Sequence, residues 1–450
     1  MIDAPSGPSG PRTSFRWVIV VLLCGVAFVL SVDRVNITVA APHIRDHFRM
    51  SDEGLGGVLG AFMFGYAVGL IPGGWLADRW GPRPLLAAAT FLWGIFTLAI
   101  GLVGAEGLLG FEGAWTALVV ARFLLGLCEA CAFPAFARTV ANWMFRHERA
   151  RATGLVQSAF TLGGALTPLA VRWVIAEFGW REAFYVSAFL TFLVALLWWA
   201  KARNRPEEHP GVSSHEMAAI ASQREEQNPL RPDRFWWAQL ARSREVYLLC
   251  LSQFLFGSAG FVFFSWFYTY FTEHRQADAE LSAGFQALAY AMMTVGATVG
   301  GWLGDLSFRR FGNPWGRRLV PLASITLGGC LGIIAPIIPN NLLAGITFAM
   351  VAGLLYTAAS SFWSTVIDLT RRGTGLLGGL QNAANWTGAA LTTTLLPTFV
   401  RVWHIPWSAA LQIAGVLGIL SGLTWLMLNP ARSIDAHCAE KGFTEMNRTR

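Results

Sequence analysis

Long apolar stretches separated by short polar segments dominate the chain. Twelve stretches reach about 20 residues, the length at which an apolar helix crosses the hydrocarbon core of a bilayer. They cover residues 16–40, 54–77, 84–104, 115–141, 152–176, 182–202, 245–272, 282–306, 318–338, 341–367, 374–400 and 405–428. Several contain glycine or proline, which membrane helices tolerate because neighbouring helices satisfy the interrupted backbone. The pattern predicts an all-α membrane protein with twelve transmembrane helices.

One long polar stretch divides the apolar segments into two groups of six. It contains four prolines and mixed charge, as linkers do, and its segment 213–227 can form a short surface helix. The sequence therefore predicts an N-terminal tail over 1–15, a six-helix bundle over 16–202, a linker over 203–244, a second six-helix bundle over 245–428 and a C-terminal tail over 429–450.

A short sequence repeat connects the two halves. The six residues GGWLAD at 73–78 return as GGWLGD at 300–305, and each copy ends an apolar stretch and is followed by arginines. A duplicated helix end of this kind predicts two pseudo-symmetric copies of one membrane bundle. Repeats of this type are the architecture by which transporters alternate a central site between two sides of a membrane.

Composition and charge agree with a membrane protein whose tails and linker are cytoplasmic. Apolar residues make up 54% of the chain and charged residues only 14%, too few to solvate a soluble domain of this size. With both termini inside, 26 of the 34 Lys and Arg residues fall in cytoplasmic segments and six in external loops. This is the positive-inside pattern, so the net charge of +7 reports topology and not nucleic-acid binding. Arginine almost without lysine is typical of a GC-rich bacterial source, which makes the inner membrane the expected location.

The sequence contains no motif that indicates catalysis or metal binding. Cys128 and Cys131 match a C-x-x-C pattern, but they lie within an apolar stretch with no second pair nearby, and we interpret them as small buried hydrophobic residues. Every histidine falls in a loop, a tail or the end of a span. The chain has no phosphate-binding loop, catalytic triad or zinc spacing, so we expect no enzyme activity, no metal and no cofactor beyond a proton gradient.

Four ionisable residues lie deep within predicted spans. Asp33 and Arg34 are in the first span, and Arg122 and Glu129 are in the fourth. Such residues are costly in a bilayer unless they face a cavity or a partner, so they indicate function. Arg122 and Glu129 share one helical face, about 10 Å apart along the axis. The set predicts an anion site with two proton-carrying carboxyls. Two structural ion pairs joining the helices are the alternative.

The loop after the second span resembles the signature of the major facilitator superfamily. Its pattern is Gly74-x-x-x-Asp78-Arg79-x-Gly81-x-Arg83. In that family the element latches the cytoplasmic gate in the outward-facing state, and the resemblance implies this role for Asp78, Arg79 and Arg83. The alternative is that these charged residues only mark the inner interface of the membrane. In the second copy the Arg-x-Gly run is replaced, so only Asp305 and Arg309 carry over.

Longer motifs resemble one branch of that superfamily, the anion:cation symporters, which include bacterial sugar-acid permeases and sialin. The motifs are DRVN at 33–36, RFLLGLCEA at 122–130, NWMFRHER at 142–149 and GGLQNAAN at 378–385. The resemblance implies proton carriage by Asp33 and Glu129. It also implies an anion site lined by Arg34, Arg122 and Tyr66. Asn382 and Asn385 share a helical face and either bind substrate hydroxyls or join helices.

Two positions depart from the polyol-acid members of this branch. Ser31 stands where those members often have tyrosine, and Phe160 stands where they often have glutamine. Two polar contacts are thus lost and a phenyl ring is gained. The departures favour an aromatic, dicarboxylic or less hydroxylated acid over a highly hydroxylated one.

The sequence therefore predicts proton-coupled uptake of an organic carboxylate by alternating access. The expected substrate is a sugar acid (a hexuronate, aldonate or aldarate) or a related acid. The other expected partners of the protein are protons and the lipid bilayer. A monomer is expected. Alternatives are an antiporter for organic phosphates, an exporter of organic acids or drugs, and a receptor that binds an anion without moving it.

Overall fold

A computed structural model describes residues 14–103, 111–222 and 234–435, and every element in these ranges is a helix. The first half holds α1 (Phe15–Phe48), α2 (Asp52–Trp80), α3 (Pro82–Leu102), α4 (Phe111–Glu129), α5 (Ala132–Trp143), α6 (Arg149–Glu177) and α7 (Trp180–Lys201). The second half holds α10 (Arg244–Thr269), α11 (Ala279–Phe311), α12 (Trp315–Ile334), α13 (Asn341–Leu369), α14 (Thr374–Val402) and α15 (Trp407–Met427). Between them, the linker contributes α8 (Ser214–Ser222) and α9 (Arg234–Arg242).

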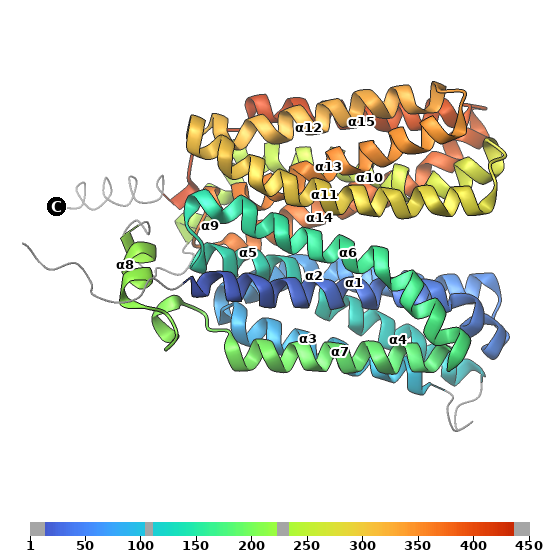
Figure 1. Cartoon of the computed structure of the whole chain (residues 1–450), viewed down its shortest axis with the longest axis horizontal. Coiled ribbons are helices and arrows are strands. Elements are labelled where there is room, and N and C mark those ends of the chain that lie inside the picture. Colours follow the sequence, from blue (N-terminus) through green and yellow to red (C-terminus); the bar gives the residue numbers. More distant parts are fainter. Residues whose placement is uncertain (1–13, 104–110, 223–233, 436–450) are drawn as a thin grey trace, which may run out of the picture.

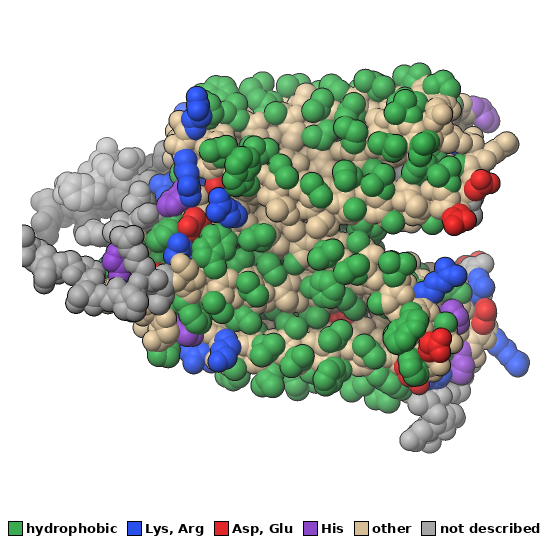
Figure 2. Space-filling model, in the orientation of Figure 1, with side chains coloured by type: hydrophobic (Ala, Val, Ile, Leu, Met, Phe, Trp, Pro, Cys, Tyr) green, Lys and Arg blue, Asp and Glu red, His purple; other side chains and the backbone are tan. Residues whose placement is uncertain are grey.

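The helices confirm the predicted membrane architecture. Eleven spans in the described residues, with α4 and α5 counted as one, are long and apolar enough to cross a membrane. The 29-residue α14, which packs between α10 and α2, completes the twelve predicted from the sequence. Apolar side chains cover the sides of the molecule, while charged side chains gather at its two ends (Figure 2). The protein is a multi-pass membrane protein.

The two halves form separate bundles that meet mainly through two pairs of helices, and α5 and α13 also contact the opposite bundle (Figure 1). The pairs are α2 with α14 and α6 with α11, each joining one bundle to the other. The beginning of α1, the linker helices and Asp435 near the end of the described chain all lie at one end of the molecule, which we call the linker end. The opposite end is called the far end.

The bundles touch along the linker half of their length and part towards the far end. At the linker half, Gly74 of α2 approaches Gly375 of α14 so closely that an added Cβ would lie 2.2 Å from the Gly375 oxygen. Gly154 of α6 approaches Gly301 of α11 in the same way. Side-chain hydrogen bonds continue this contact as far as Thr161 and Thr294. Beyond that level Figure 2 shows an open notch between the halves.

The fourth predicted span is broken into α4 and α5 at residues 130–131, where the sequence predicted one continuous helix. Pro134 explains the break, because its ring conflicts with the carbonyl four residues earlier, that of Ala130, and it has no N–H to donate there. The consequence is positional. Glu129 becomes the last residue of α4, at an interrupted helix in the interior of the bundle.

Short segments at the linker end tie the linker to both bundles. Glu216 of α8 accepts hydrogen bonds from the main-chain N–H of Phe15 and of Arg16 at the start of α1. Asp435 accepts from the Trp236 indole of α9 at 2.9 Å and from the main-chain N–H of Arg371 at 2.6 Å, just before α14. α8 covers part of the segment 213–227, whose remaining residues from 223 lie outside the described chain.

Candidate functional site

An ion pair joins the first and fourth spans in the interior of the first bundle. The Arg34 Nε of α1 lies 2.8 Å from the Glu129 Oε2 of α4. Glu129 is completely buried, and the Arg34 side chain is 13% exposed. The pairing places a buried carboxylate behind an arginine that still reaches open space. The structure thus brings together one cation and one anion of the predicted set.

Aromatic rings from both bundles surround the Arg34 guanidinium. Its central carbon lies 4.4 Å from the ring centre of Tyr66 and 5.6 Å from that of Phe62, both on α2. Phe160 of α6 lies at 5.5 Å and Trp386 of α14 at 5.9 Å. Arginine stacks favourably on such rings, and less water competes where they close around it. We call these four rings the aromatic cage. Phe160, the departure noted in the sequence, is one of its walls.

The other two charges lie beside this pair without completing a second one. Arg122 is 3% exposed, stacks 4.5 Å from the Phe62 ring, and has no carboxylate within 4.0 Å among the described residues. Its Nε and Nη1 atoms are buried without a hydrogen bond to the described part of the chain. Asp33 is 2% exposed and accepts a hydrogen bond from the Thr191 hydroxyl of α7 at 3.1 Å. Two structural ion pairs, the alternative interpretation of the four charges, are therefore not what the described residues form.

Two other predicted substrate residues, Tyr66 and Asn382, join the two bundles by a hydrogen bond. The Asn382 amide of α14 donates to the Tyr66 hydroxyl of α2 at 3.2 Å. Asn385, one turn later, donates to the Gln253 side chain of α10 at 3.0 Å. Asn382 thus lies at the bundle interface, whereas Asn385 joins two helices within the second bundle.

Asp78 of the repeated motif caps a helix of the opposite bundle. Its two carboxylate oxygens accept from the main-chain N–H of Gly375, at 2.9 Å, and of Leu376, at 2.8 Å, at the start of α14. Arg138 of α5 lies 3.7 Å from the same carboxylate. A carboxylate at a helix N-terminus satisfies free N–H groups and lies at the positive end of the helix dipole. The motif therefore holds the bundles together at the linker end.

The two arginines of the first motif lie elsewhere. Arg79 is exposed and lies 5.1 Å from the Trp75 ring on its own helix. Arg83 donates to the main-chain oxygen of Trp199 at 2.9 Å and stacks on that ring, and its own main-chain N–H donates to Asn204. These contacts join α3 to the end of α7 within the first bundle. Among the charged side chains of this motif, Asp78 makes the described hydrogen bonds that cross between the bundles, next to the close approach of Gly74 to Gly375.

The second copy of the motif repeats the cap with the bundles exchanged. Asp305 of α11 accepts from the main-chain N–H of Ala150 at 3.0 Å and of Arg151 at 2.9 Å, at the start of α6. Arg317 of α12 lies 3.8 Å from Asp305 and 2.8 Å from Asp368 at the end of α13. We call the caps made by Asp78 and Asp305 the two latches.

Cys128 lies in the last turn of α4 and Cys131 lies in the break before α5, and both are free thiols. Cys131 is buried, whereas Cys128 is partly exposed. In the part of the chain that the structure describes, no three His, Cys, Asp or Glu side chains are grouped so that they could hold a metal ion.

Comparison with known proteins decides the family. The sequence profile of the Major Facilitator Superfamily matches residues 23–378. The chain belongs to this superfamily. Its members are transporters, and the match covers most of both bundles, so the sequence-based interpretation of the chain as a transporter and not an enzyme is confirmed.

Relatives within the superfamily carry names of organic-anion transporters. A probable sulfoacetate transporter of Cupriavidus necator is 31% identical over 432 residues, which cover 94% of this chain and 96% of the relative. A probable galactarate/D-glucarate transporter of Bacillus subtilis is 28% identical, with 94% and 93% covered. A D-galactonate transporter of Escherichia coli is 29% identical, with 95% and 98% covered. The resemblance to sugar-acid permeases is thus confirmed.

Solved structures of the superfamily share the fold. The proton:xylose symporter XylE, bound to 6-bromo-6-deoxy-D-glucose, matches with a TM-score of 0.76 over 95% of this chain and 99% of its own, at 14% identity. The fucose:proton symporter FucP of E. coli matches with a TM-score of 0.72 over 92% of this chain and 99% of its own, at 14% identity. At these identities the likeness concerns the fold alone.

Sequence reasoning missed several residues that complete the latches. Asp368 accepts from Arg149 of α6 at 2.6 Å as well as from Arg317, so a carboxylate at the end of α13 holds two arginines from opposite bundles. A signal was available, because Asp368 ends an apolar stretch and is followed by Arg371 and Arg372, as Asp78 is followed by Arg79. Its partners are far away in the sequence, and no spacing rule reaches them.

Proposed function

We propose that the protein is a proton-coupled symporter that takes up a small organic acid anion by alternating access. The observation that carries the proposal is the Arg34–Glu129 ion pair beside Arg122, whose buried N–H donors have no partner among the described residues. A transporter of neutral solutes gains nothing from two buried arginines. In this proposal the protein works as a monomer in a bacterial inner membrane, with its termini and linker in the cytoplasm.

The shape of the molecule supports an outward-facing state. With the linker in the cytoplasm, the latches close the inner side and the notch opens outwards (Figure 2). Glu129 then accepts a proton from outside and releases Arg34, which Glu129 holds at 2.8 Å. The freed Arg34 guanidinium and Arg122 then bind the anion, and each arginine can donate bidentate hydrogen bonds to it. Proton and anion neutralise each other's charge, so the bundles can rock about the site.

Asp33 supplies a second carboxyl to this cycle. It lies next to Arg34 in sequence and is held by the Thr191 hydroxyl at 3.1 Å, while its Oδ1 has no partner among the described residues. Two protons carried with one monovalent anion would move net positive charge inwards. The membrane potential would then drive accumulation in addition to the pH gradient.

The aromatic cage narrows the class of substrate. Rings surround Arg34 on several sides, and a sugar-acid chain laid against them would leave hydroxyls without hydrogen-bond partners, which costs free energy. We propose a short carboxylate or sulfonate with few hydroxyl groups. The name of the C. necator relative, a probable sulfoacetate transporter, is compatible with this chemistry. The hydroxyl-rich substrates in the names of the other relatives are the competing class.

Proteoliposomes provide the test. The substitutions Glu129→Gln and Asp33→Asn remove one titratable group each and keep the shape of the side chain. Both variants are expected to lose accumulation driven by a proton gradient and to retain part of the exchange of labelled for unlabelled substrate, because exchange needs no net proton movement. Sulfoacetate and galactarate serve as the two probes. Normal accumulation by both variants would show that these carboxyls do not couple transport to protons.

Exchange of organic anions or of organic phosphates by the same fold is the second candidate. The two arginines favour it equally, since phosphate also binds arginine pairs. It predicts uptake that needs an anion on the opposite side and is indifferent to the pH gradient, whereas symport predicts uptake into vesicles that contain no counter-anion.

A further inference from the structure

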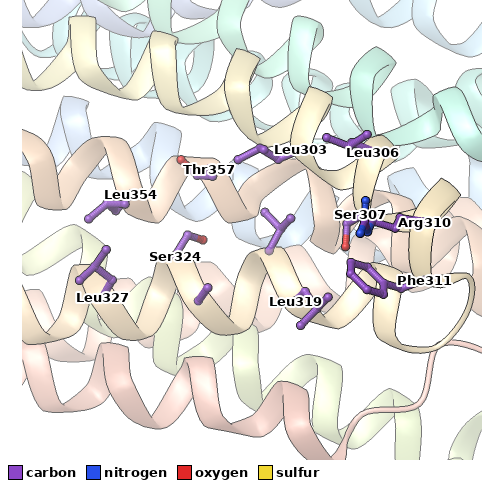
Figure 3. A pocket seen from close by; sticks show the side chains of 12 residues that line it. Leu303, Leu306, Ser307, Arg310, Phe311, Leu319, Ser324, Leu327, Leu354 and Thr357 are labelled. Atoms are coloured by element: carbon purple, nitrogen blue, oxygen red, sulfur yellow. The ribbon is translucent and has the colours of Figure 1, made fainter.

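A groove on the outer surface of the second bundle is not part of the transport site. It lies between α11, α12 and α13, at the linker end of α11, and has a volume of about 400 Å³ (Figure 3). Its walls are mostly apolar, formed by Leu303, Leu306, Phe311, Leu319, Val320, Ala323, Leu327 and Leu354. Leu306, Phe311 and Leu327 are 46–55% exposed, so the groove opens sideways towards the hydrocarbon of the bilayer.

Four polar side chains interrupt these apolar walls, and one of them, Thr357, donates to the main-chain oxygen of Gly353 on its own helix. Arg310, in the last turn of α11, lies beside Ser307 at one end of the groove, and Ser324 of α12 lies further along it (Figure 3). Ser324 is only 6% exposed. The hydroxyl oxygens of Ser307 and Ser324 are buried without a hydrogen bond to any residue that the structure describes. A buried hydroxyl without a partner is unfavourable, and either hydroxyl can donate to an acceptor oxygen in the groove once its side chain turns towards it.

The charge of the groove selects the ligand further. The Arg310 guanidinium lies 5.8 Å from the Phe311 ring and has no carboxylate within 4.0 Å in the described ranges. An exposed cation at the membrane surface above an apolar groove is complementary to an anionic headgroup above an acyl chain. A soluble anion would gain nothing from the leucine walls, and a neutral lipid would gain nothing from the cation.

We propose that this groove binds one anionic glycerophospholipid of the leaflet at the linker end. Its phosphate lies on Arg310, and its ester groups lie beside Ser307, about 4.5 Å further along α11. The Ser307 and Ser324 hydroxyls donate to the ester carbonyl oxygens after their side chains turn towards the groove. One acyl chain lies along the leucines of α11, α12 and α13. The site lies on the same helix as Asp305, on the face turned away from the other bundle.

The test measures lipid binding to the detergent-purified full chain by intact mass spectrometry. The probes are 1-palmitoyl-2-oleoyl phosphatidylglycerol and the phosphatidylcholine with the same chains. Arg310→Gln is expected to weaken phosphatidylglycerol binding about fivefold, the factor for one arginine near an anionic lipid surface. Arg309→Gln is the matched control, because Arg309 is the exposed neighbour of Arg310 in the sequence but does not line the groove. This variant is expected to leave binding unchanged within twofold.

A second variant tests the groove itself. Ala323 is exposed on its wall, and Ala323→Phe places a ring in the space of the acyl chain without touching Arg310. It is expected to weaken phosphatidylglycerol binding at least tenfold. Equal weakening by Arg309→Gln and Arg310→Gln, or unchanged binding by Ala323→Phe, would overturn the proposal. So would equal affinity of the native chain for the two lipids.

Discussion

Replacing Asp78 with asparagine should open the linker end of the protein. The carboxylate accepts two main-chain hydrogen bonds from α14, at 2.9 and 2.8 Å, and its side chain is only 7% exposed. Asparagine keeps one acceptor oxygen and turns an NH₂ group towards the other N–H donor. One hydrogen bond to a charged group is worth about 1.5–3 kcal/mol. The negative charge at the helix N-terminus adds about 0.3–1 kcal/mol.

Water recovers part of this loss when the latch opens, so we expect a net shift of about 2 kcal/mol, or about 30-fold in the ratio of closed to open molecules. The assay is a pulsed electron paramagnetic resonance distance measurement in a background without the six native cysteines. One spin-label pair, at exposed Trp80 and Trp315, reports the linker end, and a second, at exposed Phe178 and Val402, reports the far end. The first distance should lengthen and the second should shorten.

Asp46→Asn is the matched control, because Asp46 is an exposed aspartate whose charge lies outside the bundle interface. It should leave both distance distributions unchanged. If Asp78→Asn shifts the populations by less than about threefold, the caps contribute little to closure, and the energetic reasoning from charged hydrogen bonds is wrong.

Three further predictions concern the site and the interface. Arg122→Lys should weaken anion binding at least about tenfold in a radioligand assay, because lysine loses the planar fork and the stacking on Phe62; near-native affinity would remove Arg122 from the site. Gly74→Ala should lower the melting temperature or open the linker end, since its Cβ would lie 2.2 Å from a main-chain oxygen of α14, whereas Gly60→Ala on the same helix meets nothing within 4 Å and should be harmless. Phe160→Gln should shift substrate preference in competition assays towards hydroxylated acids, and an unchanged preference would mean that this ring does not select.

The sequence was enough to place the twelve spans, because hydropathy is a local property that each segment carries by itself. It was also enough to single out Asp33, Arg34, Arg122 and Glu129, since charges at membrane depth are rare. Which cation pairs with which carboxylate depends on helix packing, and the Arg34–Glu129 pair is seen only in the structure. The break before α5 was not predicted, because the apolar stretch continues across residues 130–131. Pro134 was the available sign of this break.

Contacts between the bundles could not be predicted to the same extent. The partners of Asp78 and Asp305 are main-chain N–H groups, which leave no trace in composition or spacing. Arg317, which no motif singled out, lies beside Asp305 because α12 begins next to the end of α11. Such neighbours become visible only when the helices are packed.

The latches have an evolutionary consequence. An ordinary salt bridge can be lost by change at either of its two positions. Here the receiving half of each latch is peptide backbone, at 150–151 and at 375–376, and every residue except proline supplies the same N–H group there. Sequence changes in the receiving helices therefore leave each latch intact, provided that the helices keep their close approach. The strength of each latch can be changed by substituting a single aspartate.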